Sequence, residues 1–88
     1  MKIKGEYILR EIAGETVAVP VGGTVLNSNV LIALNGSGAF LWELLTKGAD
    51  NGELVSAMCD EYEVDSKTAE KDIIEFCDYL KMNKVEFE

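Results

Sequence analysis

A short polar turn between an apolar strand and an apolar helix constrains this chain more than any other feature. The run Val30–Leu34 is β-branched and apolar, and it ends in the turn Asn35-Gly36-Ser37-Gly38. An apolar helix follows directly and contains Trp42, the one tryptophan of the chain. A strand that feeds a helix through small polar residues is typical either of a phosphate-binding loop or of a capped helix start.

The turn lacks the residues that a phosphate-binding loop needs. A Walker-type loop carries a lysine before its Ser or Thr, and no lysine lies here. A dinucleotide-binding loop lies between two parallel strands, and no second parallel strand follows. We therefore interpret the turn as a helix start in which Asn35 or Ser37 accepts a hydrogen bond from a free backbone N–H. Trp42 is then expected to anchor the core.

The first third of the chain has the composition of β-strands separated by turns. Ala13-Gly14-Glu15 predicts a hairpin turn, Gly22-Gly23 ends the second strand, and Asn27-Ser28-Asn29 predicts another turn. Near the C-terminus, Val85–Glu88 alternates and predicts a short edge strand. The three main predicted strands are Tyr7–Ile12, Thr16–Val21 and Val30–Leu34.

Three amphipathic helices account for most of the remaining residues. Gly48 is placed to end the first helix, Asp50 and Glu53 have the spacing of a capping box, and Asn83 is placed to close the third helix in a left-handed conformation. The predicted helices run from about Ser37 to Thr46, from Asp50 to Tyr62, and from Asp65 or Ser66 to about Lys81.

This order of elements predicts the fold class. Three strands followed by three helices, with a tight turn between the last two helices, form an α+β winged helix-turn-helix. The length of 88 residues favours one domain over residues 1–88.

The distribution of charge excludes one class of partner. Residues 1–48 carry four acids and four bases, whereas residues 49–88 carry twelve acids and four bases. Nucleic-acid binding needs clustered Lys and Arg, and the helical half would repel phosphate instead. No apolar run approaches the roughly 20 residues of a membrane span, and no signal peptide is evident. We expect a cytoplasmic protein with no nucleic-acid or membrane partner, whose Cys59 and Cys77 are core thiols.

The residues needed for catalysis or for a metal site are missing. The chain has no histidine, and its two cysteines lack the close spacing of a metal or redox pair. The Ser and Thr residues have no evident activating base, and the helical carboxylates alternate with Lys on solvated faces. We expect no enzymatic activity and no cofactor.

Three segments resemble those of one family. The stretch from Leu34 to Leu44 resembles the Leu-Asn-x-Thr-Gly/Ala-x-x-x-Trp-x-Leu signature of PqqD-like proteins, named after pyrroloquinoline quinone synthesis protein D. The stretch Glu53–Tyr62 is similar to the Glu-Leu-Val-x-x-Leu-x-x-x-Tyr pattern of that family, and Glu63-Val64-Asp65 before a long helix is similar to its third segment. Two departures are Asn83-Lys84, where the family usually has a glycine, and Gly36-Ser37, where an acid or proline with threonine is more common.

The resemblance implies a non-enzymatic function. Such domains bind the leader of a ribosomally made precursor peptide and present the peptide to a modifying enzyme, often a radical S-adenosylmethionine enzyme. In that family the leader pairs as an added strand on the third strand and lies against the third helix. Here the resemblance assigns the pairing strand to Val30, Leu31, Ile32, Ala33 and Leu34.

The third predicted helix has two different flanks beside its apolar stripe. One flank carries Lys67, Lys71, Ile74 and Lys81, and the other carries Asp72, Glu75 and Tyr79. Since three lysines around an exposed isoleucine reverse the local charge of an acidic half, we predict that the lysine flank contacts the leader. In the alternative interpretation these lysines only make the helix soluble.

Two other functions share the predicted architecture. A winged-helix DNA-binding regulator would need a basic recognition helix, and a purely structural subunit would hold a modifying enzyme together without a leader. The oligomeric state is open, because an exposed strand edge can pair with a second copy.

Overall fold

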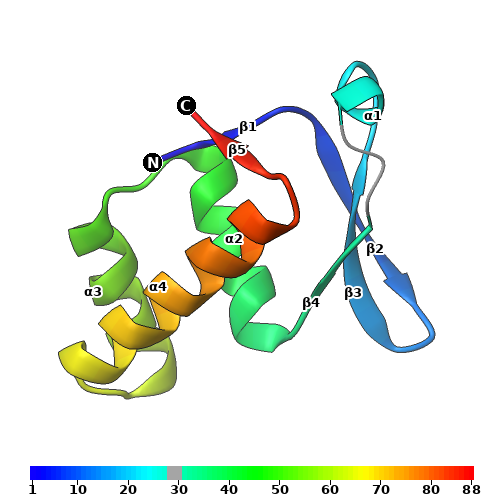
Figure 1. Cartoon of the computed structure of the whole chain (residues 1–88). Coiled ribbons are helices and arrows are strands. Elements are labelled where there is room, and N and C mark those ends of the chain that lie inside the picture. The colour runs from blue at the N-terminus through cyan, green and yellow to red at the C-terminus, as the bar shows by residue number, and fades with distance from the viewer. Residues whose placement is uncertain (28–30) are drawn as a thin grey trace.

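The computed structural model describes residues 1–27 and 31–88, with the backbone alone at residues 26 and 27. A three-stranded antiparallel sheet lies on one side of the molecule and three helices lie on the other (Figure 1). This is the α+β arrangement that the sequence predicts. The strands are β2 (Tyr7–Ile12), β3 (Glu15–Pro20) and β4 (Ile32–Leu34), in the order β2-β3-β4.

The hairpin between β2 and β3 has the expected turn. Ala13 and Gly14 both have positive φ angles, 53° and 83°. Two positive φ angles in a two-residue loop match the right-handed twist of the adjoining strands. The register pairs Tyr7 with Pro20 and Ile12 with Glu15, so the second strand begins and ends one residue earlier than predicted.

The third strand of the sheet is shorter than predicted. β4 covers Ile32–Leu34 and pairs with β3 from Ala18 to Thr16. Leu31 precedes the strand, and Val30 lies outside the described residues. Of the predicted turn at residues 27–29, only Asn27 is described, and it ends the one-turn helix α1 (Thr24–Asn27), which the sequence pattern did not indicate.

A second, two-stranded sheet joins the two ends of the chain. β5 (Glu86–Phe87) confirms the predicted C-terminal strand, and it pairs antiparallel with β1 (Ile3–Lys4). The β1 strand was not predicted, because two residues are too few for a readable alternation. The side chain of Lys2 also forms an ion pair with Glu88, with 3.9 Å between Nζ and Oε2.

The first long helix, α2 (Gly36–Lys47), begins at the polar turn as expected. Of the two candidate caps, Asn35 is the N-cap, and its side chain accepts a hydrogen bond of 2.7 Å from the N–H of Gly38. Ser37 supports this cap by donating its hydroxyl to the Asn35 oxygen. Gly48, with φ 97°, ends the helix as predicted. The turn is therefore a helix start and not a phosphate-binding loop.

The other two long helices, α3 (Asn51–Tyr62) and α4 (Ser66–Met82), start where the sequence predicts, with Asp50 as the N-cap of α3 and Asp65 as the N-cap of α4. Asp50 and Glu53 form the reciprocal hydrogen bonds of a capping box. The carboxylate of Asp65 accepts a hydrogen bond from the N–H of Thr68, which lowers the pKa of that carboxyl.

The C-terminal end of α4 differs from the prediction at one residue. Asn83 has φ −94°, so it does not adopt the left-handed conformation expected of it. Lys84 adopts that conformation instead, with φ 65°. The chain thus reverses one residue later, at a position where glycine would carry no steric cost.

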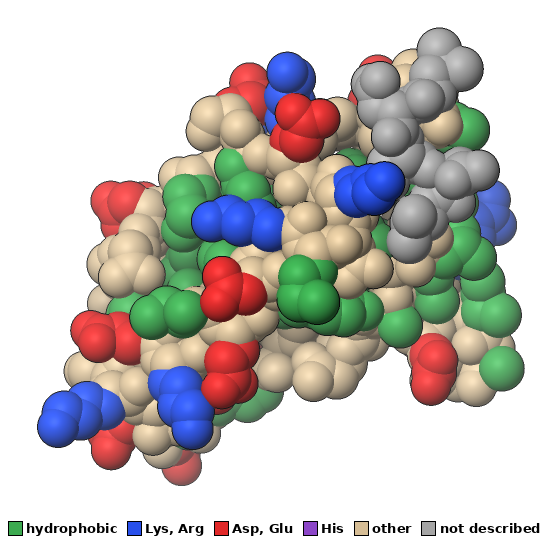
Figure 2. Space-filling view, viewed as in Figure 1, with side chains coloured by type: hydrophobic (Ala, Val, Ile, Leu, Met, Phe, Trp, Pro, Cys, Tyr) green, Lys and Arg blue, Asp and Glu red, His purple; other side chains and the backbone are tan. Residues whose placement is uncertain are grey.

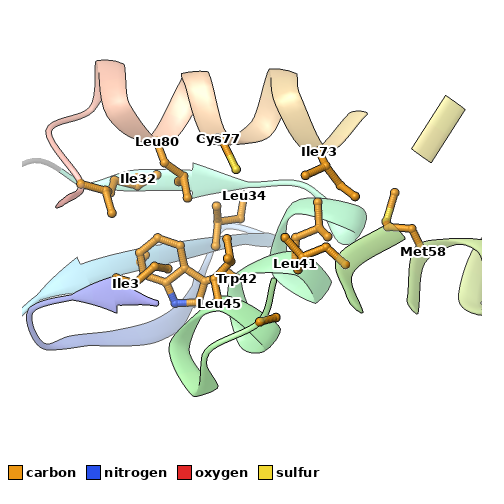
Figure 3. Close-up of a cluster of buried hydrophobic side chains, with 14 of the residues drawn as sticks. Ile3, Ile32, Leu34, Leu41, Trp42, Leu45, Met58, Ile73, Cys77 and Leu80 are labelled. Atoms are coloured by element: carbon orange, nitrogen blue, oxygen red, sulfur yellow. The ribbon is translucent and has the colours of Figure 1, made fainter. Parts of the chain in front are cut away.

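The core lies between α4, α2 and the inner face of β4 (Figure 3). Trp42 is 2% exposed and packs edge-on against Tyr7, with ring centroids 5.1 Å apart, as expected for a core anchor. Cys77 is buried and Cys59 half-buried, both as free thiols. Burial raises the pKa of the Cys77 thiol, which stays protonated at neutral pH. The labelled residues that fill this core are Ile3, Ile32, Leu34, Leu41, Trp42, Leu45, Met58, Ile73, Cys77 and Leu80.

Candidate functional site

The described sheet has an open edge at β4. In the order β2-β3-β4, β4 pairs with β3 on one side, and no described strand lies on its other side. Residues along a strand direct their backbone N–H and C=O groups alternately to its two sides. The carbonyl of Ala33 accepts a hydrogen bond from α4 and therefore faces the open side, together with the N–H of the same residue. Ile32 and Leu34 then direct their backbone groups toward β3.

A tyrosine from α4 occupies part of this edge. The hydroxyl of Tyr79 donates a hydrogen bond of 2.8 Å to the Ala33 carbonyl, across 46 residues of sequence. Tyr79 is 39% exposed, so solvent reaches the side chain that holds this contact. Sequence reasoning placed Tyr79 on one flank of the helix but had no signal that it would reach the strand.

A groove of about 890 Å³ lies beside the open edge, between β4, the start of α2 and one flank of α4. Its apolar part comes from Leu34, Leu41 and Phe76, and its charged part comes from Glu15, Asp72 and Glu75. The full lining is Gly14, Glu15, Thr16, Ala33, Leu34, Asn35, Gly36, Ser37, Gly38, Leu41, Asp72, Glu75, Phe76 and Tyr79.

The polar turn at the start of α2 also shapes this groove. A Cβ atom at Gly38 would lie 3.1 Å from Cε1 of Phe76 and 3.0 Å from the cap oxygen of Asn35. Glycine therefore allows the first turn of α2 to approach α4 closely at the floor of the groove. On the other side of the turn, the Tyr62 hydroxyl lies 3.4 Å from the Gly36 carbonyl, its acceptor.

The structure separates the predicted site residues into two groups. Ala33 and Leu34 line the groove, Leu31 is 57% exposed just before β4, and Ile32 is fully buried in the core. None of the four residues predicted on α4 belongs to the groove lining, although all four are exposed. These four are Lys67, Lys71, Ile74 and Lys81.

The α4 residues that do line the groove come from the opposite flank. Asp72, Glu75 and Tyr79 are spaced so that they lie above one another along the helix, with Phe76 beside them. On the surface carrying α4, both basic and acidic side chains are present, and hydrophobic side chains are exposed between the helix and the sheet (Figure 2). The sequence showed that these residues share one flank of the helix, but it did not show that this flank faces β4.

The described residues contain no cluster of three or more His, Cys, Asp or Glu side chains that could hold a metal ion. No described helix is long and apolar enough to cross a membrane. The open strand edge with its adjacent groove suits an extended peptide.

Comparison with known proteins identifies the family. The family model described as coenzyme PQQ synthesis protein D (PqqD) matches residues 15–85. A solved structure, described as TbiB1 in complex with the TbiA(beta) leader peptide, is 30% identical with a TM-score of 0.74, and the match covers 98% of this chain and 95% of that chain. Comparison with curated proteins gave no significant match. The family match spans β3, β4 and all three long helices, and the chain belongs to the PqqD family.

Proposed function

We propose that this protein is a peptide-recognition element that captures the leader of a ribosomally made precursor peptide and presents it to a modifying enzyme. The open edge of β4 beside a groove is the observation that carries the proposal. Membership of the PqqD family supports it, as does the similarity to TbiB1, whose structure holds a leader peptide. The protein would act in the cytoplasm, where such peptides are made, and would itself perform no chemistry.

The leader would bind as an added strand along β4. Ala33 offers an N–H and a C=O to the open side, and by alternation Leu31 offers the same pair two residues earlier. A peptide backbone that pairs there gains hydrogen bonds with little demand on its sequence, while side-chain pockets supply specificity. Every second side chain of the added strand would point into the groove.

Pairing at Ala33 requires a change at Tyr79. The tyrosine hydroxyl already donates to the carbonyl that an incoming N–H would use. The leader would displace this hydroxyl, which would turn toward solvent or toward the leader. In the free protein, the same contact partly satisfies an edge that could otherwise pair with a second copy.

The modifying enzyme would be one that acts on peptides, such as a radical S-adenosylmethionine enzyme. This part of the proposal rests on the family alone. The structural-subunit alternative predicts that an enzyme complex persists without any leader. The DNA-binding alternative lacks support, since residues 49–88 carry twelve acids against four bases.

A displayed library of random dodecapeptides tests the proposal without requiring the sequence of the leader. Peptides selected on the wild-type chain would be synthesised and titrated into protein labelled with ¹⁵N. We expect the amide signals of residues 31–34 and of the groove-facing flank of α4 to shift. The proposal fails if no peptide is selected, or if selected peptides shift only amides remote from β4.

A further inference from the structure

The charged residues of the groove all have the same sign. Glu15 places a carboxylate in the lining from the start of β3, and Asp72 and Glu75 place two more there from α4. No Lys or Arg side chain is part of the lining. The potential inside the groove is therefore negative, and an occupant with a positive charge would be favoured.

These carboxylates are not neutralised by the protein's own lysines. Among the described residues, the one ion pair joins Lys2 to Glu88, and neither residue lines the groove. Lys71 stands four residues before Glu75, a spacing that permits a pair on one helix face, yet the structure holds none there. The negative groups at the groove are thus available to a ligand.

The floor of the groove is apolar, whereas its rim is acidic. Leu34, Leu41 and Phe76 form the floor, next to the backbone of Ala33. A long side chain with an aliphatic stem and a cationic end matches both parts, because the stem covers apolar surface while the head remains at the polar rim. Lys and Arg have this form.

We propose that the peptide segment added to β4 carries a Lys or Arg side chain that enters this groove and is recognised by Asp72 and Glu75. The inference rests on the proposed function and adds the chemical class of the ligand. The floor contacts the stem of the side chain, and the two carboxylates accept hydrogen bonds from its charged end. Because side chains alternate along a strand, one basic residue, or two separated by one residue, meets this requirement.

The test compares peptide libraries selected on matched variants. On the wild-type chain we expect Lys and Arg to be enriched about threefold to tenfold at one position of the selected peptides, as for a partly exposed charge pair. The double variant Asp72→Lys with Glu75→Lys should reverse the preference toward Asp and Glu. The conservative pair Asp72→Asn with Glu75→Gln should abolish the preference without reversing it.

A control separates the groove from the net charge of the protein. Glu70 and Asp78 are exposed acids of α4 that do not line the groove. The double variant Glu70→Lys with Asp78→Lys has the same net charge as the first double variant, and it should retain the wild-type preference. Circular dichroism and thermal unfolding would verify that each variant is folded.

The possible failures are distinguishable. Selected peptides that shift the amides of residues 31–34 but show no basic preference would overturn this inference and leave the proposed function intact. The inference would also be overturned if the control variant, Glu70→Lys with Asp78→Lys, reversed the basic preference as fully as Asp72→Lys with Glu75→Lys. A wild-type chain that selects no peptide at all would remove both proposals.

Discussion

The two flanks of α4 differ in charge and in what they face. One flank presents Lys67, Lys71, Ile74 and Lys81 away from the groove, and the other presents Asp72, Glu75 and Tyr79 to it. Both flanks border the same buried stripe of Ala69, Ile73, Cys77 and Leu80. The more conspicuous flank in the sequence is the lysine flank, since it opposes the net charge of −8. The flank that contacts the strand edge is the acidic one.

This difference teaches that an unusual local charge does not show which flank of a helix faces a neighbouring groove. The lysines are exposed and partly offset the negative charge of the helical half. Exposed charges of this kind are typical of a solvated face. The acidic flank faces the strand edge, because Tyr79 reaches the Ala33 carbonyl from it. Whether the lysine flank also contacts the leader stays a prediction, and the experiments below compare the two flanks.

The largest expected effect comes from closing the strand edge that the acidic flank borders. In the variant Ala33→Pro, the edge loses an N–H and gains a ring in the path of the incoming backbone. We expect the affinity for a selected peptide to fall roughly 30-fold, about 2 kcal/mol, measured by fluorescence anisotropy. The fold should persist, because this N–H faces away from β3.

The matched control for this variant lies on the opposite edge of the sheet. By the same alternation, the N–H of Glu11 in β2 faces away from β3. Glu11→Pro should leave peptide affinity unchanged. Equal losses in both proline variants would mean that the peptide does not select the β4 edge.

The second prediction compares the flanks directly. Removing both acids, with Asp72→Ala and Glu75→Ala, should weaken binding of a basic peptide about fivefold at low salt. Removing two lysines, with Lys67→Ala and Lys71→Ala, should change affinity by less than about twofold. Titration at two salt concentrations would measure both. A greater loss from the lysine pair would restore the lysine flank as the contact surface.

The third prediction concerns the contact between the acidic flank and the strand. Tyr79→Phe removes the hydroxyl that holds the Ala33 carbonyl while keeping the ring. Since the net contribution of such a hydrogen bond is about 0.5–1.5 kcal/mol, we expect peptide affinity to rise about threefold. Weaker binding in this variant would indicate that the hydroxyl stays in place and contacts the peptide. Isothermal titration calorimetry gives the comparison with wild type.

The smallest expected effect lies at the centre of the lysine flank. Ile74 is 59% exposed and does not line the groove. Ile74→Ser should change the free energy of unfolding by no more than about 0.5 kcal/mol, measured by urea titration. Peptide affinity should stay the same. A clear loss of affinity with unchanged stability would place Ile74 in the binding surface.

Much of the fold could be predicted because it depends on neighbours in sequence. The capping box of Asp50 and Glu53, the cap at Asp65 and the hairpin at Ala13-Gly14 each involve residues at most three positions apart. Trp42 was assigned to the core because it lies on an apolar helical stripe. At the end of α4 the same reasoning was wrong by one residue, because local propensity favours Asn over Lys in the left-handed conformation, yet Lys84 adopts it and Asn83 does not.

The sequence by itself determined the order of the three main strands and the three long helices, the capping box of α3, the buried stripe of α4 and the family. Tertiary structure alone decided the pairing of Ile3 with Phe87, the contact of Tyr79 with Ala33, and the choice of flank at the groove. The physical reason is that periodicity shows which stripe of a helix is buried, and that stripe always has two flanks. Which flank meets the open strand depends on the direction in which the helix crosses the sheet, and only long-range packing determines that direction.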